Sequence, residues 1–471
     1  MIIGGGLGGL AVALRLQAAG WQATVCEAGP TFGGKMNTWE SGGFHFDTGP
    51  SLITMPWVFQ DVFAAAGGKL EEHVQLLPLD PIAEYRFDDG TRFAYTSILP
   101  GWLATLKRIA PGDQAGFFEF LALGAKLFEV SKATFFRRSP FERPAPGEWR
   151  AMRHMPLRRG WGNYQRLLEG LFRSPHLRQL YGRYPTYVGS SPWESPATLA
   201  VIPYIEFAFG GYAVKGGLYR IVEGLVALAR SRGVELLPNA RVNRIVTKSG
   251  VACGVELASG EIFGADVVVM NGDAAAVDGL LGKPVLPPAR SRSMSGFVQL
   301  IGLRKPLAGI RQHTVCFSAG YRQEFSQIFG AQRFPDDPTV YVNAPNNGDT
   351  LFIMANAPAT DVVWDEQMIS HARTRVLARL QRAGFPDFQE DIVVNDVWTP
   401  SRIASRYLMP GGAIYGSDSH GWKNAFMRPR NENPRVGGLF HVGGSTHPGG
   451  GTPTVLMSAE ITTRLIRQRY S

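Results

Sequence analysis

The stretch Gly4-Gly5-Gly6-Leu7-Gly8-Gly9 begins three residues into the chain and decides the fold class. Gly4, Gly6 and Gly9 have the GxGxxG spacing. In this motif, the first glycine permits a tight turn out of a strand and the second lets the backbone approach a pyrophosphate. The third lets the following helix pack on the sheet. Apolar residues at helical spacing follow, and Gly20 is a natural stop. We therefore predict an α/β fold with a Rossmann-type dinucleotide-binding unit.

A second strand, expected at residues 22–26, ends at Glu27. An acid at this place accepts the ribose hydroxyls of a dinucleotide. The glycine pair and cation that follow, Gly33-Gly34-Lys35, are uncommon in NAD enzymes. They resemble the second dinucleotide-binding element of FAD proteins related to amine oxidases, in which these residues lie against the diphosphate.

A rarer glycine loop, Gly443-Gly444-Ser445-Thr446-His447-Pro448-Gly449-Gly450-Gly451, lies near the other end of the chain. Two such loops separated by a large insertion indicate one fold wrapped around one long cofactor. Because only three residues precede the first glycine, either the first strand is very short or the true start lies upstream.

The composition is that of a globular protein with room for two domains: 471 residues, 45% hydrophobic and 18% charged. The three cysteines, Cys26, Cys253 and Cys316, are far apart, have no metal-ligand spacing and suit a reducing compartment. We therefore expect no metal site. The sequence has no signal-peptide pattern and no uninterrupted apolar run of about 18 residues.

The positive charge is concentrated in residues 101–184, which hold 15 Lys and Arg against 6 Asp and Glu, an excess equal to the net charge of +9. Aromatic residues alternate with these cations, as in Phe135-Phe136-Arg137-Arg138. This pattern suits an anionic membrane surface, and a solvated basic helical face is the alternative. No nucleic-acid-binding motif accompanies the charge, so we expect no nucleic-acid partner.

Further motifs follow in a fixed order: Phe46-Asp47-Thr48-Gly49-Pro50-Ser51, then Tyr187-Val188-Gly189-Ser190-Ser191-Pro192, then Gly438-Leu439-Phe440-His441-Val442 before the second glycine loop. Together with the opening segment, they resemble the bacterial-type carotenoid (phytoene) desaturases from end to end. The resemblance implies a glutathione-reductase or amine-oxidase-like FAD-binding domain. It also implies an interleaved α+β substrate domain.

The expected FAD-binding domain comprises residues 1–95, 205–290 and 426–471, and the substrate and membrane-docking domain comprises residues 96–204 and 291–425. By resemblance, the residues that contact FAD are Gly4, Gly6, Gly9, Glu27, Gly33, Gly34, Lys35, Gly49, Pro50, Ser51, Val242, Asp273, Gly443, Gly444, Pro448, Gly449, Thr454 and Val455. Glu206 and His447 are the candidate catalytic residues. His441, Thr452 and Thr454 depart from the family pattern near the flavin loop.

The implied activity is desaturation of an acyclic carotenoid, such as phytoene, diapophytoene or a 1-hydroxycarotenoid, by hydride transfer to flavin. Quinone or oxygen would be the final electron acceptor. Such an apolar substrate favours the membrane interpretation of the basic stretch and a peripheral position on the cytoplasmic face of the membrane. Three alternatives remain open: a carotenoid isomerase or oxygenase of the same family, an amine-oxidase-like flavoenzyme, and a flavin-bearing subunit without turnover.

Overall fold

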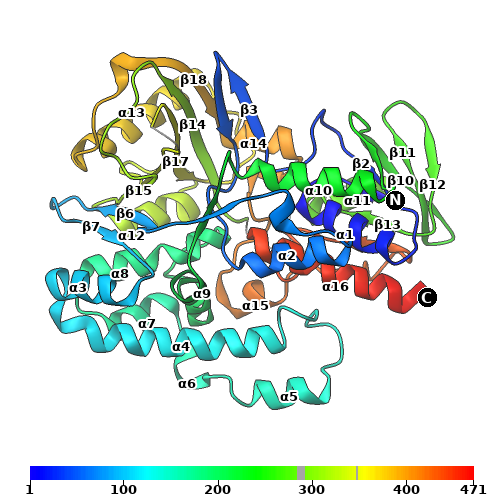
Figure 1. The fold of residues 1–471 in the computed structure, drawn as a ribbon, viewed down its shortest axis with the longest axis horizontal. Coiled ribbons are helices and arrows are strands. Elements are labelled where there is room, and N and C mark those ends of the chain that lie inside the picture. Colours follow the sequence, from blue (N-terminus) through cyan, green and yellow to red (C-terminus); the bar gives the residue numbers. More distant parts are fainter. Residues whose placement is uncertain (284–291, 346–347, 471) are drawn as a thin grey trace.

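The structure is a computed structural model that describes residues 1–283, 292–345 and 348–470. Figure 1 shows two sheets side by side. Both chain termini lie on the side of the first sheet, the C-terminus at the end of helix α16 (Thr452–Tyr470), and the second sheet lies above a block of helices. No helix in these described ranges is long and apolar enough to cross a membrane.

The first sheet is parallel and five-stranded, and four separate parts of the chain build it. Its order is β19 (Leu439–His441), β13 (Val268–Met270), β1 (Ile2–Ile3), β2 (Thr24–Cys26) and β9 (Glu235–Leu237). The central strand β1 is two residues long and pairs with β13 on one side and β2 on the other. Segments more than 400 residues apart in the sequence therefore meet in one sheet.

Three helices pack against this sheet: α1 (Leu7–Ala18), α10 (Tyr219–Ser231) and α16 (Thr452–Tyr470). α1 and α16, from opposite ends of the chain, lie side by side in Figure 1. Gly8 makes this approach possible, because a Cβ there would lie 3.0 Å from Val442 and 3.2 Å from Val455. The predicted helix stop is confirmed, since Gly20 follows α1 with a φ of +88°.

A small antiparallel sheet of β10 (Val242–Lys248), β11 (Val251–Leu257) and β12 (Ile262–Gly264) flanks the parallel one. The remaining short elements here are α2 (Pro56–Ala65), α11 (Val277–Leu280), and the pairs β3 (Thr38–Ser41) with β4 (Phe44–Asp47) and β5 (Leu76–Pro78) with β8 (Tyr212–Val214).

The second sheet has seven strands in the order β18 (Ile392–Trp398), β14 (Ser295–Leu303), β17 (Thr350–Ala357), β16 (Val340–Asn343), β15 (His313–Cys316), β6 (Ala83–Arg86) and β7 (Arg92–Tyr95). Helix α13 (Glu366–Arg382) covers one face, where Val376 and Leu380 are buried with the strand residues Phe297, Ile301 and Ile353. The other face lines the cavity described below.

The hairpin of β6 and β7 pairs with β15, in parallel through Thr314 and Glu84, and so belongs to the second sheet. The sequence assigned residues 1–95 to the FAD-binding domain, and that boundary stays a prediction. A local hairpin pattern predicts two strands, but it cannot show which sheet they join. The boundary predicted at residue 290 lies outside the described residues.

Residues 99–182 are mainly helical. They form α3 (Leu99–Ile109), α4 (Gln114–Ala133), α5 (Pro146–Met152), α6 (Leu157–Gly160), α7 (Tyr164–Leu171) and α8 (Pro175–Gly182). Helix α9 (Val201–Phe209) packs on α4, and Gly124 allows their close contact, since a Cβ there would lie 2.4 Å from Tyr204. Because α9 spans the boundary predicted at residue 204, it joins the two halves. The other short helices are α12 (Tyr321–Phe325), α14 (Pro400–Tyr407) and α15 (Gly421–Phe426).

Candidate functional site

One cavity of about 1560 Å³ joins the two halves of the molecule. Residues of both glycine loops line it, as do side chains of the seven-stranded sheet and of α9. A pocket for a single drug-sized ligand has roughly 300–1,000 Å³. The volume therefore allows a long cofactor and a second ligand, and the prediction that the two distant glycine loops share one site is confirmed.

The first glycine loop forms a cradle held by backbone contacts. A Cβ on Gly9 would lie 2.2 Å from the Gly4 carbonyl oxygen, so only glycine fits there. Asn271, at the end of β13, donates from Nδ2 to that same oxygen at 3.0 Å. Gly6, Leu7 and Gly8 at the start of α1 line the cavity, and the N-terminus of a helix favours a phosphate. Sequence reasoning missed Asn271 as a clamp on this loop, because its role depends on strand pairing.

Glu27 stands at the end of β2, as predicted. Its carboxylate accepts from the Gly5 amide through Oε2 and from the Gly29 amide through Oε1, each at 2.8 Å. These two bonds fix its orientation at the cavity wall, and the remaining lone pairs can accept from ribose hydroxyls. Val242, the first residue of β10, lines the same end of the cavity.

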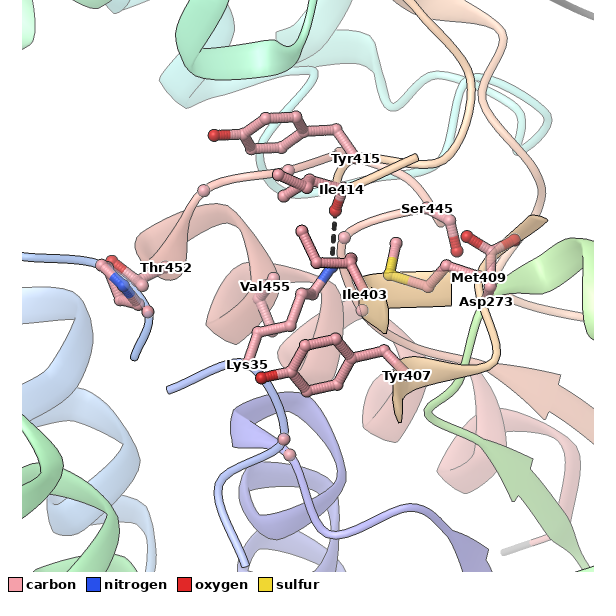
Figure 2. Close-up of a pocket in the computed structure, with 18 of the residues that line it drawn as sticks. Lys35, Asp273, Ile403, Tyr407, Met409, Ile414, Tyr415, Ser445, Thr452 and Val455 are labelled. Carbon is pink, nitrogen blue, oxygen red and sulfur yellow. Dashed lines mark hydrogen bonds between the residues drawn. The ribbon is translucent and has the colours of Figure 1, made fainter. Parts of the chain in front are cut away.

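Gly33 and Gly34 pack against the first loop, and Lys35 reaches from them towards the second. A Cβ on Gly34 would lie 3.1 Å from Gly6, and one on Gly33 would lie 2.2 Å from the Met36 carbonyl oxygen. Figure 2 shows the Lys35 ammonium group donating to the Ile414 carbonyl oxygen, at 2.6 Å. Burial lowers the pKa of this ammonium, while Asp273 opposes that shift.

Asp273 carries a buried acceptor without a partner. Its Oδ1 accepts from the Ala275 amide at 2.9 Å, whereas Oδ2 has no hydrogen-bond partner among the described residues. The side chain is 7% exposed, and burial raises the pKa of its carboxyl group. In Figure 2 it lies close to Ser445 of the second glycine loop. A buried oxygen at a cavity wall needs a hydrogen-bond donor. The hydroxyl groups of a polyhydroxylated cofactor chain would donate to it.

The second glycine loop closes the other end of the cofactor region. Gly443, Gly444, Pro448, Gly449, Thr454 and Val455 all line the cavity, as do Gly49, Pro50 and Ser51 of the earlier motif. Gly450 must be glycine, because a Cβ there would lie 2.4 Å from the Tyr415 ring. Thr454 donates back to the Gly450 carbonyl oxygen at 2.8 Å, so this departure from the family pattern stabilises the loop. Together, the two cradles and the unpaired Asp273 oxygen fit FAD.

The two candidate catalytic residues have different surroundings. Glu206 lines the cavity and is 2% exposed. Its Oε1 accepts from the Tyr184 hydroxyl, and its Oε2 has no partner among the described residues. Burial raises the pKa of this carboxyl group. It can therefore accept either a proton or a hydrogen bond from a ligand.

His447 is fully buried and does not line the cavity. Its Nε2 lies 2.8 Å from the Phe135 carbonyl oxygen, and its ring packs edge-on against the Phe135 ring. Burial lowers the pKa of this imidazole to about 4. The structure thus places His447 where it holds the glycine loop to the helical block, away from the cavity wall.

The part of the cavity beyond the cofactor region is mostly apolar. Its walls come from β14, β17, β18, α9 and α14: Val298, Phe352, Met354, Trp398, Ile202, Ile205 and Ile403. Polar groups gather at one place in this wall, where Arg183, His313 and Tyr341 lie. None of these three residues was singled out from the sequence. His313 and Tyr341 lie on different strands, so no local motif contains both of them.

The outer surface near the cavity carries exposed aromatic residues. Trp149 is 57% exposed, Trp161 is 53% exposed and Trp422 is 57% exposed. Trp161 stacks on Phe426, which touches the cavity-lining Phe135. We call Trp149, Trp161 and Trp422 the tryptophan surface. Of the cations beside it, Arg138 pairs with Glu148 and Arg159 pairs with Glu119, so they carry less net charge than the sequence suggested.

Comparisons with known proteins agree with this geometry. The chain matches the family described as flavin containing amine oxidoreductase over residues 7–467. It is 32% identical to a 4,4'-diapolycopene oxygenase of Methylomonas sp, covering 98% of this chain and 96% of that protein. It is also 32% identical to a 1-hydroxycarotenoid 3,4-desaturase of Flavobacterium sp. (strain P99-3), covering 99% and 98%. A hydroxyneurosporene desaturase of Rubrivivax gelatinosus is 33% identical, covering 99% and 92%.

Solved structures show the same fold at lower identity. Putrescine oxidase bound to putrescine superposes with a TM-score of 0.64 at 17% identity, covering 99% of this chain and 98% of that one. The fatty acid isomerase of P. acnes superposes with a TM-score of 0.62 at 14% identity, covering 100% and 98%. These likenesses confirm the predicted fold class.

Proposed function

Because the chain belongs to the flavin-containing amine oxidoreductases, and within them to the carotenoid desaturases, we propose that this FAD enzyme introduces double bonds into an acyclic carotenoid. The observation that carries the proposal is the single cavity, which runs from the dinucleotide cradle into a long apolar section. Phytoene, diapophytoene and 1-hydroxycarotenoids are the substrate types that this section suits.

The reaction removes two hydrogens from adjacent carbons, one as a hydride and one as a proton. When bound, FAD supplies the acceptor for the hydride that leaves an allylic carbon. The residues of the chain orient the polyene and exclude water: Val298, Phe352 and Ile202 form apolar walls around it. The start of α16, where Thr452, Pro453 and Thr454 line the cavity, would stabilise negative charge on a bound flavin through its N-terminal N–H groups. The electron pair then passes to a quinone or to oxygen.

Product analysis tests this proposal. The FAD-loaded protein is added to liposomes that contain one of the three polyenes together with a quinone, and the pigments are separated by chromatography. We expect one polyene to gain a longer chromophore and to lose two mass units per new double bond. Unchanged pigments despite bound flavin would refute desaturation.

Oxygenation of a terminal carbon is a second candidate, because the diapolycopene oxygenase is among the relatives with full-length similarity. The same mass spectra separate the two reactions, since an oxygenase adds oxygen to the product. Anaerobic reduction of the bound flavin by substrate, followed by addition of either a quinone or air, identifies the electron acceptor from the rate at which oxidised flavin absorbance returns.

Docking at a membrane surface is the third part of the proposal. A polyene dissolves in the bilayer, and Trp161 of the tryptophan surface is linked through the Phe426 ring to Phe135 at the cavity wall. Tryptophan favours the membrane interface because one end of its ring is apolar and its N–H group is polar. The exposed Arg150 and Arg153 beside Trp149 would add attraction to anionic lipids. We propose a peripheral position on the cytoplasmic face.

A further inference from the structure

A polar cluster interrupts the apolar wall of the cavity near β16, β15 and β6. Arg183 donates from Nη1 to the Tyr187 hydroxyl at 2.8 Å, and its guanidinium carbon lies 5.0 Å and 5.4 Å from the ring centroids of Tyr187 and Tyr341. The Tyr341 hydroxyl lies 2.7 Å from His313 Nδ1 and 2.5 Å from Ser51 Oγ. These contacts fix Arg183 at the cavity wall.

Glu206 adjoins this cluster, because it accepts from the Tyr184 hydroxyl, the Tyr184 ring lies against Tyr187, and its carboxylate interacts electrostatically with Arg183. Glu206 and His313 each keep an unpaired polar atom. Glu206 Oε2 and His313 Nε2 have no hydrogen-bond partner among the described residues, although each residue is 2% exposed. Both residues line the cavity with Arg183. Buried polar atoms without a partner are rare in folded proteins and need a reason. A ligand with a polar group at this point of the cavity would supply the missing hydrogen-bond partners.

The polar groups present define the chemistry of that ligand. Arg183 only donates hydrogen bonds, an ionised Glu206 only accepts them, and a neutral His313 does one or the other at Nε2. A hydroxyl group matches this set, since its oxygen accepts from Arg183 while its proton is donated to Glu206. A ligand carboxylate would repel Glu206, and a carbonyl group has no proton for it.

We propose that Arg183, Glu206 and His313 bind a hydroxyl group carried by an otherwise apolar polyene, so that the substrate is a hydroxylated acyclic carotenoid. This inference rests on the proposed desaturase function and specifies its substrate class. It gives Glu206 a role in substrate recognition, in place of the catalytic role considered from the sequence. The other part of the cavity wall, with Val298, Phe352 and Trp398, accommodates the apolar remainder of the chain.

A pair of substrates tests the inference. The FAD-loaded wild type is given either a 1-hydroxylated acyclic C40 polyene or its parent hydrocarbon in liposomes with a quinone. Sites that hydrogen-bond a substrate hydroxyl reject the analogue that lacks it strongly, so we expect a preference in kcat/KM of at least about 100-fold for the hydroxylated polyene. Arg183→Met should abolish most of this preference while the flavin content stays that of the wild type. Arg322→Met, which changes an exposed arginine on α12, is the matched control.

Glu206→Gln separates recognition from catalysis. Recognition predicts a lower kcat/KM for the hydroxylated polyene and an unchanged value for the hydrocarbon. A catalytic role predicts an equal loss of kcat with both substrates, and that result would overturn the assignment of Glu206.

Other outcomes distinguish the two proposals. If the wild type converts both polyenes equally well, and Arg183→Met changes both rates alike, the hydroxyl site is refuted and the desaturase function stands. Conversion of neither polyene would overturn both. If the variants lose their flavin, an inhibition experiment on the wild-type enzyme tests the site instead. A short branched tertiary alcohol should inhibit polyene conversion more strongly than the matching alkane, and equal inhibition would refute the site.

Discussion

The cofactor end and the substrate end of the cavity are built by different means. Around the cofactor end the contacts come largely from backbone atoms: Gly9 against the Gly4 carbonyl oxygen, Gly34 against Gly6, and Glu27 held by two amides. At the substrate end, side chains from separate strands and helices form the wall, and polar atoms remain unpaired. Backbone contacts tolerate almost no change in residue type, whereas a side-chain wall can be refitted to another ligand while the fold is kept.

Gly9→Ala provides the strongest test of this comparison. The added methyl group would lie 2.2 Å from the Gly4 carbonyl oxygen, so the loop must move away from the pyrophosphate position. We expect flavin affinity to fall by at least about 100-fold, an effect of about 3 kcal/mol. Flavin absorbance per protein after gel filtration measures it. Gly170→Ala in α7 is the control, because no atom lies within 4 Å of a Cβ there. Normal flavin content in Gly9→Ala would contradict the tight cradle.

His441→Leu tests how tightly the cofactor end is packed. Burial lowers the pKa of His441 to about 4, below the 6.5 of an unfolded chain, so the unfolded state takes up the proton first as the pH falls. The stability contributed by the neutral ring is therefore complete above pH 6.5 and is lost towards pH 4. The leucine variant should lose less stability over this range, by up to about 3 kcal/mol. Urea unfolding at several pH values measures the difference, with the exposed His154→Leu as control. Parallel curves for variant and wild type would contradict it.

Val298→Trp tests the substrate end. The larger side chain fills part of the apolar section and leaves the glycine cradles untouched, since Val298 is on β14 at the cavity wall. We expect polyene conversion to fall at least about tenfold while flavin content is kept, because the polyene and the indole ring compete for the same volume. Val393→Trp, on an exposed position of β18, should have neither effect. A loss of flavin in Val298→Trp would show that the two ends are not independent.

The smallest effect is expected on the outer surface. Replacing Trp149, Trp161 and Trp422 by alanine should weaken binding to anionic vesicles about tenfold, since each partly inserted ring contributes only a fraction of its burial free energy. Vesicle co-sedimentation measures the binding, and FAD content should not change. Trp21→Ala, which removes a tryptophan away from this surface, serves as the comparison. Unchanged sedimentation of the triple variant would remove the docking proposal.

Much of the cofactor end was predictable from sequence. The GxGxxG segment, Glu27 and the second glycine loop each act through local backbone geometry, and all of them line one cavity as expected. Local patterns do not show which partner an element takes. The hairpin of β6 and β7 joined the second sheet, and His447 lies against Phe135. Asn271 was missed for the same reason, since its contact with Gly4 spans 267 positions.

The sequence by itself determined the fold class and the cofactor cradle, because glycine spacing and strand–helix periodicity express restrictions on the backbone that act over a few residues. The family came from the resemblance of its ordered motifs. Only the tertiary structure decided the substrate wall. Arg183 directly follows α8, Glu206 is on α9, His313 is on β15 and Tyr341 is on β16, and only Glu206 was singled out from the sequence. Their chemistry arises from shared burial in one cavity, where exclusion of water leaves polar atoms unpaired until a ligand meets them.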